Sequence, residues 1–285
     1  MSVYDCTSPE SREEGIAAAA AALSRGELIV LPTDTVYGIG AAAFDPTAVA
    51  ALLEAKGRGR QHPPPVLVGT AATLEGLATE LHPAVPALVE AFWPGPLTII
   101  CRAHSTLAWD LGDTGGTVAL RMPDDEVALD LLTRTGPLAV SSANRHGRPA
   151  AQTVLEAATA LGDRVAVYLD GGDSPGGEVS TIVDATGPVP RIVRDGALSH
   201  EELAAVVEVR PMVPAATPTG SADTSTGATD ARTDARTGSA DAQTGGTAAR
   251  TDAPPRSADE QTGGRDGAGR DRASGDSATG GAHGR

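Results

Sequence analysis

Residues 28–56 read LIVLPTDTVYGIGAAAFDPTAVAALLEAK and contain one complete structural unit. The apolar run Leu28–Leu31 is typical of a short buried strand. After a polar loop, Asp45 and Pro46 supply a helix cap and a favourable first helical residue, and Gly57 follows where the helix is expected to end. A strand, a loop and a helix in this order indicate an α/β fold, in which helices cover a central sheet.

The same alternation extends in both directions along the chain. Ser8 and Pro9 begin a predicted helix that ends at Gly26. Further strands are predicted over 66–68, 97–101, 118–120, 138–140, 165–169, 181–183 and 192–193. Further helices are predicted over 71–79, 84–92 and 126–133. A capping box at Thr153 and Glu156 begins another short helix, and a second capping box at Ser199 and Glu202 begins a last helix that ends near Val209. Short late strands and glycine-rich connections favour a mixed sheet. The sequence therefore predicts one α/β domain over residues 1–210.

The remaining segment, 211–285, has a different composition. Its large apolar residues are Met212 and Val213 alone, it has no aromatic residue, and it consists mainly of Ala, Gly, Thr, Ser, Asp and Arg. Such a segment cannot bury enough apolar surface to offset the entropy lost on ordering. We therefore predict a disordered, low-complexity tail.

Charge and cysteine content exclude several classes of protein. The chain has a formal net charge of −15, and residues 1–210 hold 27 acidic against 14 basic residues. Such a domain binds nucleic acid poorly without sequence preference, so a bound anion needs a local basic site. Cys6 and Cys101 cannot form a disulfide framework or a zinc site. Without a run of about 18 apolar residues or a basic-then-apolar N-terminus, we expect a cytoplasmic protein with no membrane segment.

Candidate ligand-binding residues follow the predicted strands, because loops that leave strand ends bind ligands in open α/β sheets. Four such loops carry polar side chains, namely 33–38, 117–121, 141–144 and 191–196. A fifth segment, 56–60, leaves a helix C-terminus and contains Lys56, the single lysine among 22 basic residues. A lone ammonium suggests a position that needs a compact charge. Interaction with the helix dipole is sufficient to explain Arg60.

Three familiar catalytic motifs do not fit this sequence. The phosphate-loop pattern G-x-x-x-x-G-K-[ST] is missing, and 38–43 matches the dinucleotide glycine pattern only loosely because six residues separate it from Leu31. Ser141 and Ser142 lack the G-x-S-x-G context of a nucleophilic serine. The six histidines show no metal-ligand spacing, so no metal centre is predicted.

Seven segments occur together in the order of one family. They are Leu31–Gly40 (LPTDTVYGIG), Lys56-x-Arg58, Trp93–Thr98 (WPGPLT), Val118–Pro123 (VALRMP), Ser142-Ala-Asn144, Ser180–Asp184 (STIVD) and Ile192–Gly196 (IVRDG). In these motifs the chain resembles the YrdC/TsaC family, the threonylcarbamoyl-AMP synthases. The resemblance implies a twisted mixed sheet with flanking helices and a concave, locally basic ligand cleft.

The resemblance also implies a reaction. A nucleotidyltransferase of this family converts L-threonine, bicarbonate and ATP to L-threonylcarbamoyladenylate and pyrophosphate, and Mg²⁺ accompanies the ATP. A downstream transferase machinery then passes the threonylcarbamoyl group to adenosine 37 of tRNAs that read ANN codons, which makes tRNA a more distant partner. Little covalent chemistry is left to the protein in such a reaction, so positioning and charge neutralisation carry catalysis.

The matching motifs assign site residues by resemblance. Lys56 and Arg58 correspond to the pair at the triphosphate and are the expected catalytic residues. The other residues implied on the ATP side are His62, Thr117, Ser142, Asn144 and Arg194. On the threonine side they are Thr35, Tyr37, Arg121, Ser180 and, through its backbone alone, Val140. A guanidinium such as that of Arg121 suits the bidentate binding of a carboxylate.

The chain departs from the family pattern in three places. Residues 61–66 (QHPPPV) replace the usual Asn-Pro-Leu or Lys-Gly-Leu, which leaves His62 as the expected substitute at the phosphates. A family histidine after this strand corresponds to Gly69 or is missing, and Ala150 stands where serine is frequent. The segment 211–285 does not resemble the second domain with which longer members close the site.

Two other functions stay open at this point. One is a non-catalytic module of the same fold that binds double-stranded RNA or tRNA, against which the acidic charge argues. The other is carbamoyl adenylation from carbamoyl phosphate, as in hydrogenase maturation proteins that contain this fold. Those proteins carry acylphosphatase and zinc-finger segments, and neither is visible in this sequence.

Overall fold

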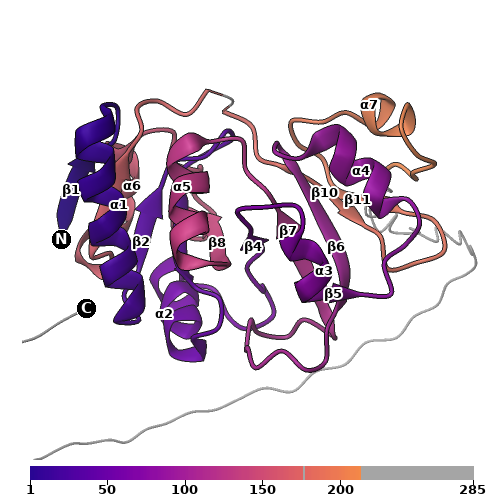
Figure 1. The fold of residues 1–285 in the computed structure, drawn as a ribbon, viewed down its shortest axis with the longest axis horizontal. Helices are drawn as coiled ribbons and strands as arrows, with labels where there is room; N and C mark the ends of the chain where they lie inside the picture. Colours follow the sequence, from indigo (N-terminus) through magenta and orange to yellow (C-terminus); the bar gives the residue numbers. More distant parts are fainter. Residues whose placement is uncertain (176, 213–285) are drawn as a thin grey trace, which may run out of the picture. The chain divides into compact units, whose positions relative to one another are not determined.

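The computed structural model describes residues 1–175 and 177–212, which build a mixed sheet flanked by helices (Figure 1). From edge to edge the strand order is β1-β9-β2-β3-β8-β4-β7-β6-β10-β11, and β5 pairs with β6. The strands are β1 (Ser2–Asp5), β2 (Ile29–Leu31), β3 (Gly38–Ala42), β4 (Val66–Leu67), β5 (Ala78–Thr79), β6 (Leu97–Ala103), β7 (Thr117–Arg121), β8 (Leu138–Ser142), β9 (Val167–Asp170), β10 (Thr181–Asp184) and β11 (Arg191–Arg194). Parallel pairs such as β4 with β7 alternate with antiparallel pairs such as β6 with β7, which confirms the predicted mixed α/β fold.

Local sequence signals determine where the helices begin and end. The helices are α1 (Pro9–Ser24), α2 (Pro46–Lys56), α3 (Thr73–Leu77), α4 (Val85–Phe92), α5 (Glu126–Thr135), α6 (Val154–Leu161) and α7 (His200–Ala204), with a 3₁₀ turn at Gly162–Arg164. The Ser8 side chain caps α1 and the Asp45 carboxylate caps α2 by accepting from backbone N–H groups. Gly57 ends α2 in the left-handed conformation, with φ of 66°.

The half of the sheet that contains β1, β9, β2, β3 and β8 is covered on both faces. Ile29 and Leu31 of β2 pack into a cluster with α1 and α5, which lie side by side in Figure 1. Val30, between them, packs into a second cluster with α2 and α6. Because side chains alternate along a strand, these two clusters lie on opposite faces of the sheet.

The half that contains β7, β6, β10 and β11 is different. Ile99 of β6 and Leu120 of β7 pack into one apolar cluster that includes Leu88 of α4. Their neighbours along the strands, Thr98 and Arg121 among them, face a cavity instead. This half of the sheet therefore has one face in the core and one face at the cavity.

Three strands were missed by the sequence analysis. β3 is rich in glycine and alanine, which have low strand propensity, yet it is central and pairs with both β2 and β8. β1 is an exposed edge strand, and β5 has two residues and interrupts the predicted helix over 71–79. None of the three carries the alternating or continuous apolar pattern on which the prediction depended.

Two helix predictions need correction at their ends. The last helix stops at Ala204 instead of extending to Val209, although the Ser199–Glu202 capping box is present as predicted. Thr153 caps α6, but the Glu156 carboxylate accepts from the N–H of Gln152, so this cap is not a full capping box. The predicted tail lies outside the described residues from position 213 onward.

No helix in the described ranges is long and apolar enough to cross a membrane.

Candidate active site

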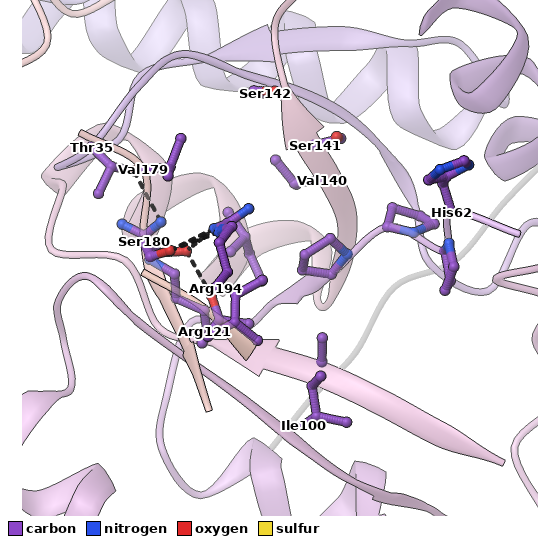
Figure 2. Close-up of a pocket in the computed structure, with 18 of the residues that line it drawn as sticks. Thr35, His62, Ile100, Arg121, Val140, Ser141, Ser142, Val179, Ser180 and Arg194 are labelled. Atoms are coloured by element: carbon purple, nitrogen blue, oxygen red, sulfur yellow. Dashed lines mark hydrogen bonds between the residues drawn. The ribbon is translucent and has the colours of Figure 1, made fainter. Parts of the chain in front are cut away.

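A cavity of about 330 Å³ opens between the two halves of the sheet (Figure 2). Ten of the predicted site residues line it, namely Thr35, Tyr37, Arg58, His62, Thr117, Arg121, Val140, Ser142, Ser180 and Arg194. They come from the β2–β3 loop, the segment after α2, and strands or strand ends of β7, β8, β10 and β11. The resemblance thus identified side chains that are distant in sequence and that the fold brings to one cavity.

Arg121 occupies a buried position at the end of β7. Its Nη2 lies 2.5 Å from Asp34 Oδ1, its Nη1 donates to Thr35 Oγ1 at 3.0 Å, and its Nε donates to the carbonyl of Gly95 at 3.0 Å. The two ion-pair side chains are 7% and 12% exposed. Burial lowers the pKa of Arg121, and the Asp34 carboxylate opposes that effect. The guanidinium is therefore held in place before any ligand binds.

Arg194 extends from β11 and is anchored to neutral groups. Its Nε and Nη2 donate to the Ser180 carbonyl at 3.0 and 2.6 Å, and Nη2 also donates to Ser180 Oγ at 2.8 Å. Ser180 Oγ in turn lies 2.8 Å from Thr98 Oγ1. Burial, followed by repulsion from Arg121 and Arg58, lowers the pKa of Arg194 to about 10. Its charge is thus available for an anion, because no acidic residue neutralises it among the ion pairs of the described chain.

Arg58 is the third cation of the cavity and follows α2. Its Nε donates to His146 Nδ1 at 3.2 Å and its Nη1 donates to Ser141 Oγ at 3.2 Å. Burial lowers its pKa. Within the described ranges, no aspartate or glutamate lines this cavity. Asp34 pairs with Arg121, so Arg58 and Arg194 leave a local positive charge in an acidic domain.

Lys56 does not line the cavity, and its role at the triphosphate stays a prediction. It is 1% exposed, and its Nζ donates to the Ser142 carbonyl, to the Asn144 carbonyl at 2.8 Å and to Asn144 Oδ1 at 3.1 Å. Burial and the nearby Arg58 charge lower the pKa of Lys56 to about 7. The ammonium therefore fixes the loop that follows β8 from behind.

Asn144 is likewise withdrawn from the cavity. Its side-chain oxygen accepts from Ser142 Oγ at 2.5 Å as well as from Lys56, and its amide donates to the carbonyls of Arg145 and Arg148. All four groups belong to the same loop or to Lys56. Asn144 shapes this loop, and Ser142 is the member of the Ser-Ala-Asn motif that reaches the cavity.

The Tyr37 hydroxyl also binds groups of the protein. The residue is fully buried, its hydroxyl donates to the Gly172 carbonyl at 2.5 Å and accepts from the Gly171 N–H at 3.1 Å, and burial raises its pKa. The hydroxyl is thus used to hold the loop after β9. Tyr37 contributes wall surface, while the neighbouring Thr35 places its hydroxyl at the Arg121 guanidinium.

The remaining predicted residues lie where a ligand can reach them. His62 lines the cavity near His146, with 5.4 Å between ring centroids, and Thr117 lines it while its hydroxyl donates to the Thr114 carbonyl at 2.8 Å. Val140 lines the cavity, but its N–H is used by the Pro65 carbonyl at 2.8 Å.

Sequence reasoning missed several contributors to the site. Asp34 was quoted within a motif without a role, yet it forms the ion pair with Arg121, and its buried Oδ2 has no hydrogen-bond partner among the described residues. The position on β4 that faces the cavity is Leu67, whereas Gly69 packs against the backbone of α5. Strand alternation around Val66 was the signal that could have identified Leu67.

Comparisons with known proteins identify the family of this chain. The sequence model of the Sua5, YciO and YrdC proteins, described as "Telomere recombination", matches residues 21–196. The chain belongs to the Sua5/YciO/YrdC family.

Several members of this family are similar over two thirds of this chain or more. A Mycobacterium tuberculosis protein named "Putative threonylcarbamoyl-AMP synthase" is 52% identical over 206 residues, which are 72% of this chain and 95% of that protein. The threonylcarbamoyl-AMP synthase of Pyrococcus abyssi is 37% identical over 196 residues, 67% of this chain and 57% of that protein. The crystal structure of P. abyssi Sua5 complexed with L-threonine superposes with a TM-score of 0.71 at 33% identity, covering 74% of this chain and 62% of that one.

Proposed function

We propose that this protein is a threonylcarbamoyl-AMP synthase, which makes L-threonylcarbamoyladenylate and pyrophosphate from L-threonine, bicarbonate and ATP. The observation that carries the proposal is the convergence of Arg58, Arg121 and Arg194 on one cavity that no described carboxylate lines. Carboxylate and phosphate groups are the ligands that such a site favours. The relatives named as this synthase, and the one with L-threonine bound, supply the substrate identity.

The two substrates divide the cavity between them in this proposal. Arg121 receives the threonine carboxylate, because Asp34 and Thr35 already hold its guanidinium in a fixed orientation. Thr35 and Ser180 offer hydroxyl groups to the same substrate. The nucleotide side consists of Arg58, Arg194, His62, Thr117 and Ser142, which line the cavity together.

The chemistry requires positioning more than covalent participation. Threonine nitrogen first bonds to the carbon of bicarbonate, with loss of water, to give N-carboxy-threonine. An oxygen of the new carbamate group on nitrogen then attacks the α-phosphorus of ATP, a phosphorus–oxygen bond forms, and the bond to pyrophosphate breaks. Negative charge accumulates on the departing pyrophosphate, where Arg58 and Arg194 stabilise it. The guanidinium groups are already oriented, so little reorganisation is needed during reaction.

Mg²⁺ is part of the proposal as the companion of ATP. No group of three or more His, Cys, Asp or Glu side chains in the described chain is arranged to hold a metal ion, and the described cavity lining has hydroxyl groups but no carboxylates. This donor set fits an ion bound through phosphate oxygens and water, as Mg²⁺ commonly is. When bound, Mg²⁺ would supply charge neutralisation at the phosphates.

The adenylate is an activated intermediate and needs an acceptor. We propose that a separate transferase machinery consumes it to modify adenosine 37 of tRNA, in the cytoplasm, where the buried free thiols of Cys6 and Cys101 would stay reduced. Direct tRNA binding is not required for the first step.

The deciding experiment measures pyrophosphate release from ATP and Mg²⁺, with and without L-threonine and bicarbonate. L-Serine serves as the control amino acid, because it lacks the threonine methyl group. Release that needs both threonine and bicarbonate supports the proposal. Tight tRNA binding without threonine-dependent turnover would instead indicate an RNA-binding module, and release driven by carbamoyl phosphate would indicate the other adenylation reaction.

A further inference from the structure

The loop between β6 and β7, residues 104–116, forms one wall of the nucleotide side of the cavity. Leu111 and Thr114 of this loop line the cavity, and Thr117 follows directly on β7. The facing wall is the segment 57–65 after α2, which carries Arg58 and His62. The distance between these two segments determines how the polyphosphate end of a nucleotide can fit.

A pair of charged side chains ties the two segments together. The Arg60 guanidinium binds the Asp110 carboxylate in a bidentate manner, with Nη1 to Oδ2 at 2.9 Å and Nη2 to Oδ1 at 2.8 Å. Its Nε also lies 3.4 Å from Asp113 Oδ1. Bidentate arginine–carboxylate geometry fixes orientation as well as distance. Arg60 was expected to interact with the end of α2, but in the structure its side chain binds the other loop, at Asp110 and Asp113.

The backbone of the two segments is equally close. The Asp113 N–H donates to the Arg60 carbonyl at 2.8 Å, and the Gly112 N–H donates to Asp110 Oδ1 at 3.0 Å. A Cβ on Gly112 would lie 2.6 Å from the Arg60 carbonyl oxygen, and its φ of 102° is unfavourable for other residues. The approach therefore depends on glycine at this position.

An aromatic contact holds the same loop at a second point. Trp109 stacks on Phe44, with 5.4 Å between ring centroids and an interplanar angle of 19°. Phe44 directly precedes the cap of α2, whereas Arg60 follows that helix. Loop 104–116 is thus attached to the residues that precede α2 and to those that follow it. Lys56 is the last residue of this helix, and Arg58 comes shortly after it.

We propose that Arg60 and Asp110 are positioning residues that set the width of the ATP side of the cavity. Neither residue lines the cavity, so each acts through Arg58 and His62 on one wall and through Thr114 and Thr117 on the other. The proposal rests on the function proposed above, because it names ATP as the ligand. It adds a determinant of ATP affinity that the motif residues do not include.

The first test compares Arg60→Ala and Asp110→Asn with the wild-type chain. A simple charge effect predicts opposite outcomes, because loss of a cation weakens binding of an anion and loss of an anion strengthens it. If the Arg60–Asp110 ion pair instead sets the width of the cavity, both variants raise the KM for ATP. The expected rise is about fivefold, because exposed ion pairs contribute little free energy. The KM for threonine stays the same. Arg60→Lys, which retains the charge but not the bidentate geometry, gives an intermediate value.

Arg102→Ala is the matched control for this test. Arg102 lies on β6, forms an exposed ion pair with Glu80 at 3.4 Å, and does not line the cavity, so its loss leaves the KM for ATP unchanged. Tighter ATP binding by Asp110→Asn, or equal changes in both KM values, would overturn the proposal.

A steric test uses glycine substitutions in the same loop. Gly112→Ala raises the KM for ATP, whereas Gly115→Ala, also at positive φ but with no atom within 4 Å of the added Cβ, leaves it unchanged. Thermal unfolding of both variants shows whether they fold equally well. ATP dissociation constants from calorimetry keep the test independent of turnover, so wild-type binding without turnover would contradict the proposed function alone. Equal ATP affinity of both glycine variants would contradict the proposal that the contact between the two segments sets the width of the ATP side.

Discussion

The two halves of the sheet use the same strand geometry for different purposes. In the half around β2, both faces carry apolar side chains, since Ile29 and Leu31 pack under α1 and α5 and Val30 packs under α2 and α6. In the half around β7, Leu120 faces the core, whereas its neighbour Arg121 faces the cavity. Leaving one face of a sheet without covering helices creates room for polar and charged groups.

This difference separates stability from binding within one sheet. A substitution in the apolar clusters of the doubly covered half, away from the β8 residues that line the cavity, removes packing and leaves the cavity as it is. A substitution on the cavity face removes a ligand contact, and it affects stability only where the side chain also neutralises a buried charge. The four predictions below test this separation, beginning with the residue that combines both effects.

Arg121→Leu has the largest expected effect. It removes the proposed threonine carboxylate contact and leaves the Asp34 carboxylate buried without its partner, which costs roughly 3–5 kcal/mol of unfolding free energy. Turnover falls by at least about 100-fold. Denaturant unfolding and pyrophosphate release measure the two effects. Adding Asp34→Asn restores part of the stability and none of the turnover, and recovery of both together would show that the two roles are not separable.

Leu131→Ala tests the doubly covered half. Leu131 is fully buried on α5 and packs against α1, so truncation costs about 2–5 kcal/mol. The KM values for threonine and ATP remain at their wild-type values at a temperature where the variant is folded. A change in either KM would break the separation between the two halves.

Lys56→Met tests a residue that binds the loop after β8, at the boundary between the two halves of the sheet. The pKa of Lys56 is about 7 in the folded chain and 10.5 in its ordinary state, so the unfolded chain binds more protons between these pH values. The free energy of unfolding of the wild type therefore rises with pH across this window. The Lys56→Met variant lacks this rise in the free energy of unfolding, which amounts to roughly 2–4 kcal/mol.

Urea unfolding at pH 7 and near pH 10 measures that contribution. The difference between wild type and variant isolates Lys56, because other groups titrate in both proteins. Parallel pH dependences would contradict the assignment of a buried, uncharged amine to the folded state at high pH.

Ser180→Ala has the smallest expected effect. It removes one acceptor for Arg194 and one partner for Thr98, but the Ser180 carbonyl still accepts from Arg194. The KM for threonine and the KM for ATP each rise by about two- to fivefold, because the variant loses one modest hydrogen bond to threonine and one that orients Arg194. Ser24→Ala, in an exposed helix turn, is the control with no change. An effect as large as that of Arg121→Leu would mean that Ser180 does more than offer one hydroxyl group to threonine and orient Arg194.

The fold was largely predictable because the residues that begin and end its helices are local sequence signals. Caps such as Ser8 and Asp45, and the glycine that ends α2, are encoded within a few residues of each helix. The strand β3 could not be predicted in the same way. Glycine and alanine give it no apolar pattern, and its place in the sheet depends on β2 and β8, which are distant in sequence.

The site was predictable as a set of residues but not as a set of contacts. The resemblance named ten side chains that line the cavity. It could not show that Lys56 and Asn144 point into the loop after β8, or that the Tyr37 hydroxyl is used by another loop, because sequence gives no direction for a side chain. Ion pairs between distant segments, such as Arg60 with Asp110, cannot be predicted from the sequence for the same reason.

The burial of Lys56 has a chemical consequence for the product. A carbamoyl adenylate is an acylating agent, and an uncharged lysine amine is one of the side chains that such an agent can modify. The chain has one lysine in its whole sequence, and that amine is 1% exposed behind the Ser142–Asn144 loop. Arginine remains protonated and does not compete as a nucleophile. Among the described residues, the cavity is lined by arginine and not by lysine, so it presents no lysine amine to such a product.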